Sequence, residues 1–187
     1  MTSATKGLVK LFCGTYVFGI AGSVTFFDKV GYLATVDGRS MQPAFNPKHS
    51  KWRDIIFCNR WIIRGSRIQK GDIVSLVSPN HPNEVLVKRI IALEGETIRT
   101  LNYKTRYVTV PKGHCWMEGD NHEQSLDSNF FGPVSVGLIH SKATHILWPW
   151  DRNQRLKSDI PAGRTVLDRR RVAELQENGE LADNGDV

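Results

Sequence analysis

The sequence has little of what a metal site or a disulfide framework requires. Its three cysteines, Cys13, Cys58 and Cys115, are odd in number and form no C-x-x-C motif. Its six histidines are scattered and include no H-x-x-x-H pair. We therefore expect neither a metal nor another cofactor. We expect Cys58 and Cys115 to be free, buried thiols, with a bridge between them in an oxidising compartment as the alternative.

Clustered positive charge is equally scarce, although the formal net charge is +6. Basic residues are mixed with acidic ones along the chain, and only Arg169-Arg170-Arg171 forms a tight group. A domain that lies next to an anionic membrane accounts for this charge as well as a nucleic-acid-binding protein does. Because the basic residues are dispersed, we expect membrane lipid, and not nucleic acid, as a partner.

Long apolar runs are limited to one, the uncharged stretch from Leu11 to Phe27. Its 17 residues are at the lower limit for a membrane-spanning helix, and it has no polar face. No clear A-x-A cleavage site follows it, so we predict a retained anchor, with a buried helix of a soluble protein as the alternative. The predicted organisation is an N-terminal flank (1–10), a transmembrane signal-anchor (11–29), a β domain that carries the candidate site (30–150) and a polar, partly disordered tail (151–187).

Beyond this run, the chain consists largely of short apolar segments of strand length. Turns rich in Gly, Pro and Asn separate them, and no alternation of strands and helices indicates a parallel sheet. We therefore predict a mostly β, antiparallel domain, with a bulge or bend at Gly137 and a short helix within 165–177. The expected strands are Ile55–Cys58, Trp61–Ile63, Ile73–Val77, Glu84–Leu93, Thr97–Arg99, Tyr107–Val110, Cys115–Glu118 and Val134–Trp148.

Ser40 and Lys88 together suggest a chemical mechanism. A serine hydroxyl is a weak nucleophile that needs a base, and no histidine has surroundings that nominate it. Lys88 lies in an apolar run, where a strand places Leu86 and Ile90 on its own face and Arg89 on the opposite, solvated face. Burial lowers the pKa of a lysine, so that a neutral amine can accept the proton of a serine. Taken singly, Ser40 is more simply explained as a turn serine. Lys88 alone is more simply explained as a lysine at the edge of a sheet, with its stem packed and its amine in water.

Four motifs occur in a fixed order between residues 36 and 139. As an ordered set they resemble the type I signal peptidase family, the membrane-bound Ser/Lys endopeptidases. Within that family, the chain is most similar to the mitochondrial inner membrane peptidases of the subunit 2 type, because it has short loops, a single anchor and the tripeptide Asp-Ser-Asn. The motifs are Ser40-Met41-x-Pro43, then Gly71-Asp72-Ile73-Val74, then Lys88-Arg89 followed by Gly95-Glu96, and last Gly119-Asp120-Asn121 with Ser125-x-Asp127-Ser128 and Gly132.

The resemblance assigns a role to each candidate site residue. It implies that Ser40 is the acylating nucleophile and Lys88 the general base. Ser125 would hydrogen-bond the Lys88 amine, and Asp127 would brace the active-site loop. We also expect substrate contacts at Met41 and Val87. The implied substrate is a preprotein that binds as an added strand and is cut after a small residue.

The same resemblance implies a location and a partner. The protein would be a single-pass protein of the mitochondrial inner membrane with its catalytic domain in the intermembrane space. It would form a heterodimer with a second, homologous peptidase subunit. The alternatives are a bacterial-type signal peptidase and a non-catalytic, membrane-anchored assembly subunit. A self-cleaving repressor with the same dyad would need a DNA-binding domain, whereas the chain before Ser40 is membrane-like.

Two positions depart from the family pattern. Many members carry an arginine, paired with the aspartate, where this chain has Asn129, whose neutral amide can hydrogen-bond Asp127 but cannot form a charged fork. Bacterial members often place a hydroxyl residue two positions before the nucleophile as an oxyanion donor, and here that position is Gly38. The backbone N–H of Ser40 remains as one donor, and the sequence identifies no second one.

Overall fold

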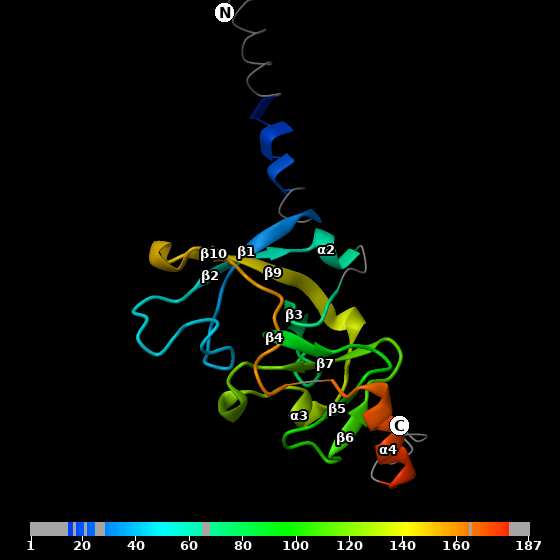
Figure 1. Cartoon of the computed structure of the whole chain (residues 1–187). Coiled ribbons are helices and arrows are strands. Elements are labelled where there is room, and N and C mark those ends of the chain that lie inside the picture. The colour runs from blue at the N-terminus through cyan, green and yellow to red at the C-terminus, as the bar shows by residue number, and fades with distance from the viewer. Residues whose placement is uncertain are drawn as a thin grey trace, which may run out of the picture.

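The computed structural model describes residues 15–16, 18–20, 22–24, 29–64, 68–164 and 166–179. Residues 15–24 are helical wherever they are described, and Figure 1 shows them projecting away from the β domain. Among the described residues, no helix is long and apolar enough to cross a membrane. The predicted flank (1–10), more than half of the predicted anchor (11–29) and Cys13 lie outside the described residues.

The strands form one large antiparallel sheet and a smaller hairpin, which confirms the predicted mostly β, antiparallel domain. Every strand pair in the large sheet is antiparallel, and β10 (Gln154–Arg155) pairs with β9 outside the main order. The small sheet pairs β5 (Thr97–Arg99) with β6 (Tyr107–Thr109). In sheet order the main strands are β1 (Gly31–Thr35), β2 (Ile55–Asn59), β9 (Ile139–Trp148), β3 (Ile73–Val77), β4 (Val85–Ala92), β7 (His114–Glu118) and β8 (Val134–Ser135).

The long strand β9 joins the two halves of the sheet, because it pairs with β2 on one side and with β3 on the other. Register shifts interrupt both pairings, and another occurs between β4 and β7. Such irregularities bend a sheet. In Figure 1, β1, β2 and β10 accordingly lie near the N-terminal helix, and the β5–β6 hairpin lies at the far end of the domain.

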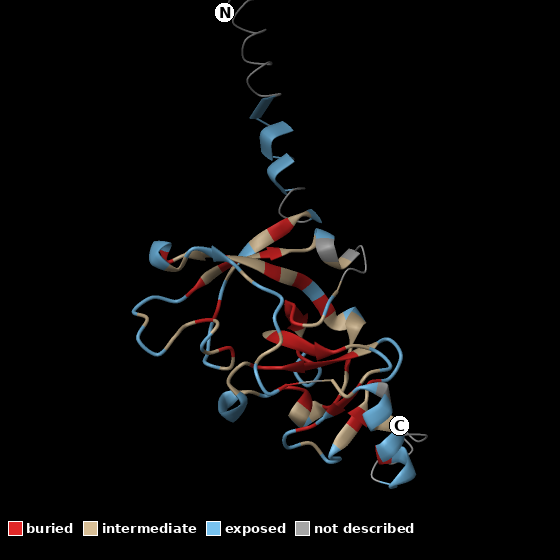
Figure 2. Ribbon diagram, in the orientation of Figure 1, coloured by how far each residue is buried: buried red, intermediate tan, exposed pale blue. Residues whose placement is uncertain are grey.

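Three buried clusters follow this division of the sheet. One packs β1, β2 and β9 against the segment after β1, through Met41 and Phe45. A second joins β3, β4, β7 and β9, and a third packs β4 and β7 against the hairpin around Trp116. Figure 2 shows β3, β4 and β7 as largely buried strands. Strand β4 is exposed at its start and buried from Lys88 onward, so this lysine marks the point where β4 enters the core.

Cys58 and Cys115 are free and fully buried, in separate clusters, which confirms the predicted free thiols. Burial raises the pKa of the Cys115 thiol to about 12. Burial also raises the pKa of Cys58, against weaker opposing effects from Ser141, Tyr32 and Arg60. Both side chains therefore act as small apolar residues of the core.

One predicted strand is wrong. Trp61–Ile63 belongs to a four-residue helix, α2 (Trp61–Arg64). The pairing of β2 with both β1 and β9 stops at Asn59, so the chain leaves the sheet there. Local apolar character indicated a strand, whereas the length of the neighbouring strands decided where pairing ends. The predicted bend at Gly137 is confirmed, since a 3-10 turn, η2 (Val136–Leu138), separates β8 from β9.

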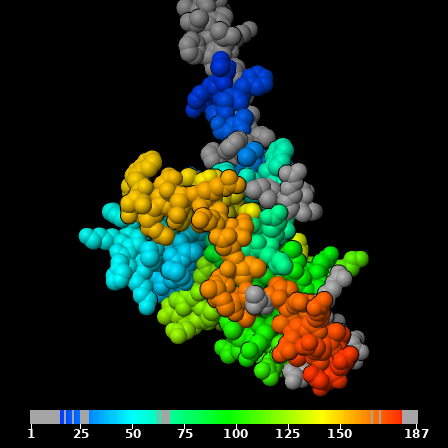
Figure 3. Space-filling view, in the orientation of Figure 1, coloured from blue at the N-terminus to red at the C-terminus, as the bar shows by residue number. Residues whose placement is uncertain are grey.

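The chain after β9 returns across the domain. It passes through η3 (Trp150–Arg152) and β10, and then through residues 156–164, which we call the strap. Figure 3 shows this orange segment crossing the surface towards the last helix, α4 (Arg169–Glu177). Helix α4 lies within the predicted 165–177, and the Asp168 side chain caps it by accepting from Arg170 N. Residues 180–187 lie outside the described residues.

Candidate active site

Lys88 is a buried lysine in the middle of β4. Its exposed fraction is 2%, and it pairs with Val74 of β3 in the sheet. Burial lowers the pKa of the Lys88 amine, and the nearby carboxylates of Asp127 and Glu84 act in the opposite direction. Its Nζ donates a hydrogen bond of 3.1 Å to Ser125 Oγ. The amine is therefore desolvated, directed by a hydroxyl, and easier to deprotonate than an exposed lysine.

Arg89 is buried rather than solvated, which corrects the expectation from strand alternation. Its Nε and Nη2 donate to Asp120 Oδ1 and Oδ2, both at 2.7 Å. Its Nη1 donates to Gly71 O at 2.9 Å and to Asp159 O of the strap at 3.0 Å. The side chain does leave the Lys88 face, but the strap and Asp120 cover the opposite face as well. A fully paired guanidinium can be buried there because each of these donors has an acceptor.

Ser40 lies on the turn that follows β1 and is half-buried. Directly after Ser40, the Phe45 N–H donates to Met41 O at 2.9 Å and closes the turn. The turn is held from the side by Asn121, whose backbone N–H donates to Ser40 O at 2.9 Å and whose Nδ2 donates to Arg39 O at 3.2 Å. The Gly-Asp-Asn motif thus contacts the Ser40 turn directly. Through Asp120, the same motif is bonded to Arg89, the neighbour of Lys88.

Asp127 anchors the loop that carries Ser125. It is 2% exposed and caps α3 (Ser128–Phe131) by accepting from Asn129 N at 3.0 Å. It also accepts from Gly119 N at 2.9 Å and from Asn129 Nδ2 at 3.1 Å. The amide of Asn129 therefore bonds Asp127 in the way that the sequence suggested.

Gly119 lies where the Ser40 turn and the Ser125 loop meet. A Cβ at this position would overlap both Ser125 Oγ and Ser40 O. Only glycine allows the two segments to approach so closely, which explains the residue type at the start of the Gly-Asp-Asn motif. Gly38 has a different constraint, because its φ of 84° lies in the left-handed region and no atom lies close to where a Cβ would be. The turn thus favours glycine two positions before Ser40, and this position supplies no side-chain hydroxyl as an oxyanion donor.

Sequence reasoning missed a buried ion pair beside this loop. Glu118, 1% exposed, accepts from Arg164 Nε at 2.7 Å and also from Arg164 Nη2. The same carboxylate accepts from Trp116 Nε1 at 2.8 Å and from Asn129 Nδ2 at 3.1 Å. The only signal in the sequence was an acidic residue at the end of an apolar strand. Its partner, 46 positions later, had no local signature.

Ser40 and Lys88 line the same pocket, of about 740 Å³, together with the predicted substrate contacts Met41 and Val87. Met41 forms part of its wall from the core, and Val87 is half-buried. Within the described ranges no hydrogen bond joins Ser40 Oγ to Lys88 Nζ, although catalytic hydrogen bonds are often long without substrate. Leu126, Phe130 and Phe131 add apolar side chains to the lining of the same pocket.

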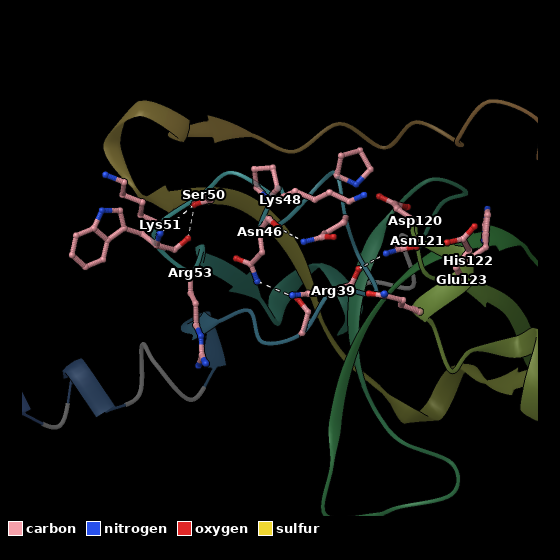
Figure 4. Close-up of a pocket in the computed structure, with 16 residues that line it drawn as sticks. Arg39, Asn46, Lys48, Ser50, Lys51, Arg53, Asp120, Asn121, His122 and Glu123 are labelled. Carbon is pink, nitrogen blue, oxygen red and sulfur yellow. Dashed lines mark hydrogen bonds between the residues drawn. The ribbon is translucent and has the colours of Figure 1, made fainter.

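A second pocket, of about 1130 Å³, lies on the other side of the Ser40 turn. It shares Gly38, Arg39 and Gln124 with the first pocket, so the two pockets adjoin there. Figure 4 shows its two walls, with Lys48 and Lys51 on one and residues 120–123 on the other. Among the described residues, no cluster of His, Cys, Asp and Glu could hold a metal ion.

Comparisons with known proteins identify the family of the chain. The family described as "Signal peptidase, peptidase S26" matches residues 6–104 and 99–148. Mitochondrial inner membrane protease subunit 2 of Mus musculus is 51% identical over 158 residues, which cover 84% of this chain and 90% of the relative. The Saccharomyces cerevisiae protein of the same name is 35% identical, with 81% and 86% covered.

More distant relatives are also found. Mitochondrial inner membrane protease subunit 1 of Mus musculus is 36% identical over 146 residues, with 76% of this chain and 84% of the relative covered. A solved signal peptidase I from Enterococcus faecalis is 24% identical and covers 40% of this chain and 95% of that chain, at a TM-score of 0.35. That score is too low to support an argument about the fold. The likeness to the subunit 2 type that the motifs indicated is confirmed by the curated relatives.

Proposed function

The chain belongs to the signal peptidase family, peptidase S26, and on this premise we propose that it cleaves sorting peptides from preproteins through a Ser40/Lys88 dyad. The observation that carries the proposal is the Lys88 amine. It is buried, its pKa is lowered by burial, it bonds the Ser125 hydroxyl, and it shares a pocket with Ser40. A lysine in these surroundings is suited to general-base chemistry. Without such a role, its burial would only cost the free energy of desolvating the amine.

The proposed reaction proceeds through an acyl-enzyme. Neutral Lys88 accepts the Ser40 hydroxyl proton while Ser40 Oγ attacks the scissile carbonyl carbon. The resulting ammonium then gives this proton to the leaving amine as the C–N bond breaks. Lys88, neutral again, accepts a proton from the water that attacks the ester, and returns it to Ser40 Oγ as the ester C–O bond breaks, which releases the acid product and restores the free enzyme. Ser125 keeps the amine directed in each step, and the Ser40 N–H stabilises the oxyanion.

The substrate enters this mechanism as an extended segment. Pocket walls come from the end of β1 and the start of β4, where Ala34 and Leu86 lie. A preprotein segment that runs between these strand ends can form backbone hydrogen bonds with them, as added strands do. Met41 and Val87 then limit the size of the side chain before the scissile bond, which favours a small residue.

The proposed location follows from the names of the relatives. We place the protein in the mitochondrial inner membrane, with residues 11–29 as a single anchor, residues 30–150 as the peptidase domain and that domain in the intermembrane space. The likeness to subunit 1 proteins supports a heterodimer with a homologous subunit. Membrane lipid and preproteins are the other partners, and nucleic acid is not one.

Cleavage of a reporter preprotein by the full chain in membranes tests the dyad. Ser40→Ala and Lys88→Ala should each lower the cleavage rate about a thousandfold or more. Lys104→Ala, an exposed lysine of the β5–β6 loop, is the matched control and should cleave normally. Near-normal cleavage by Lys88→Ala contradicts the dyad. Absence of Ser40-dependent cleavage, even with the homologous subunit present, favours the non-catalytic assembly subunit.

A further inference from the structure

We propose that Arg164, on the strap, is a positioning residue that holds the Ser125 loop in place through Glu118, Asn129 and Asp127. The inference rests on the proposed function of Ser40 and Lys88. The family match ends at residue 148, so the strap lies beyond it. The strap nevertheless contacts Glu118, the residue before Gly119, through Arg164.

The first step is the fixed geometry of Arg164 and Glu118. Arg164 is 7% exposed and grips both oxygens of the Glu118 carboxylate with Nε and Nη2. Its Nη1 donates to Arg99 O at 2.8 Å, so the guanidinium is held from a second side. A carboxylate that is 1% exposed needs such a partner to remain charged. Removing Arg164 leaves this acid, next to Gly119, with its hydrogen bonds from Trp116 and Asn129 and with His122 Nδ1 at 4.0 Å, but without its guanidinium.

The second step is the side-chain amide of Asn129. Its Nδ2 donates to Glu118 Oε1 and to Asp127 Oδ1, both at 3.1 Å, so one amide group joins the two carboxylates. Its Oδ1 accepts from Leu101 N at 2.8 Å, which fixes the orientation of the amide. The arginine that many family members place at this position is absent here. Arg164 of the strap supplies the positive charge instead. It pairs with Glu118, the carboxylate that the Asn129 amide also bonds.

The third step links Asp127 to the reacting groups. Asp127 accepts from Gly119 N, and Gly119 packs against Ser125 Oγ and Ser40 O. Ser125 Oγ in turn accepts from Lys88 Nζ. Displacement of Asp127 would therefore shift the hydroxyl that directs the amine, and small misplacements of this kind are costly in rate.

The strap is anchored independently of Arg164. Ser158 Oγ donates to Asp72 Oδ1 at 2.5 Å, and Lys142 forms an ion pair with the same carboxylate. Arg89 Nη1 donates to Asp159 O at 3.0 Å. Figure 3 shows the strap running over the domain surface between these contacts and α4. A substitution at Arg164 thus tests the Glu118 contact without releasing the whole strap.

The experiment compares Arg164→Gln, Arg164→Lys and the double variant Glu118→Gln/Arg164→Gln in the full chain. Arg170→Gln, a change in α4 away from this network, is the matched control. We expect Arg164→Gln to lower kcat for a reporter preprotein about a hundredfold per folded molecule, with KM changed less than about threefold. Arg164→Lys should recover part of this loss. The double variant should recover most of it, because the glutamine that replaces Glu118 can still accept from Asn129 and needs no counter-charge.

A second measurement does not depend on activity. Amide hydrogen exchange of the segment 117–129 should be faster in Arg164→Gln than in the unchanged chain, and slow again in the double variant. Cleavage by each variant is also measured with Ser40→Ala added, so that only Ser40-dependent cleavage is attributed to the protein. Normal kcat and unchanged exchange in folded Arg164→Gln, or equal losses in Arg164→Gln and Arg170→Gln, overturn the proposal. Lack of Ser40-dependent cleavage with altered exchange would overturn the proposed function alone.

Discussion

Lys88 Nζ donates to Ser125 Oγ at 3.1 Å inside the pocket that Ser40 also lines. This contact joins two segments that are 37 residues apart, the apolar strand β4 and the loop before α3. The hydroxyl gives the buried amine a fixed direction, and burial gives it a lowered pKa. Direction and pKa are separate contributions, which different substitutions and conditions can isolate.

The first prediction concerns pH and activity. Burial lowers the pKa of Lys88, so the neutral, proton-accepting amine is present at lower pH than for an exposed lysine. We expect kcat/KM to fall as the pH decreases through this lowered pKa, because protonation removes the base. A pH–rate profile with a reporter peptide measures it. An acid limb that is centred at the pKa of an exposed lysine would contradict the assignment.

The same shift has a consequence for stability. Because the pKa of Lys88 is lower in the folded state, the unfolded chain binds more protons in the interval up to the ordinary lysine pKa of 10.5. Stability that depends on Lys88 therefore rises with pH in that interval. Urea unfolding of Lys88→Met and of the unchanged chain should show the advantage of the methionine shrinking as the pH rises. A difference that is independent of pH would contradict this prediction.

The second prediction concerns the Ser125 hydroxyl. Ser125→Ala keeps Lys88 buried but removes the acceptor of its hydrogen bond. We expect kcat to fall about tenfold to a hundredfold with little change in KM, because the amine is no longer directed. Steady-state cleavage measures both constants. Ser135→Ala, in which the lost hydroxyl only caps η2, is the control and should retain full activity.

The third prediction concerns Gly119. In Gly119→Ala the new methyl group would overlap Ser125 Oγ and Ser40 O, so both segments must move apart. We expect a loss of cleavage and a destabilisation of about 1–3 kcal/mol, as for other overpacked sites. Thermal unfolding and reporter cleavage measure these effects. Gly137→Ala, where the nearest atom is 3.5 Å from the added carbon, should have little effect on either.

The fourth prediction concerns the buried pair of Arg89 and Asp120, whose side chains are 9% and 8% exposed. Asp120→Asn leaves the guanidinium without a counter-charge and should destabilise the fold by about 3–5 kcal/mol. It should also weaken the Asn121 contact with Ser40 O and so lower kcat. Glu123→Gln, an exposed change in the same loop, provides the comparison for both measurements. A stable, fully active Asp120→Asn would show that the pair does not hold the Ser40 turn.

Much of the β domain could be predicted because strand signals are local. The apolar run in the segment 84–93 indicated β4, and the structure has a strand there with Lys88 buried in its middle. The same reasoning failed at Trp61, because the end of β2 depends on where its neighbours β1 and β9 stop pairing. It also failed at Arg89, since alternation states which face a side chain is on and not what covers that face.

By itself, the sequence determined the antiparallel β class, the buried setting of Lys88 and, through four ordered motifs, the family and the candidate residues. These depend on residue type and short spacing, which a chain carries before it folds. Only the tertiary structure decided how Glu118 is neutralised, what stands in for the arginine absent at Asn129 and which residues cover Arg89. Each of these is a contact between segments far apart in the chain, such as Arg164 with Glu118 at a separation of 46 residues. Packing, and no local pattern, brings such charges together in the core.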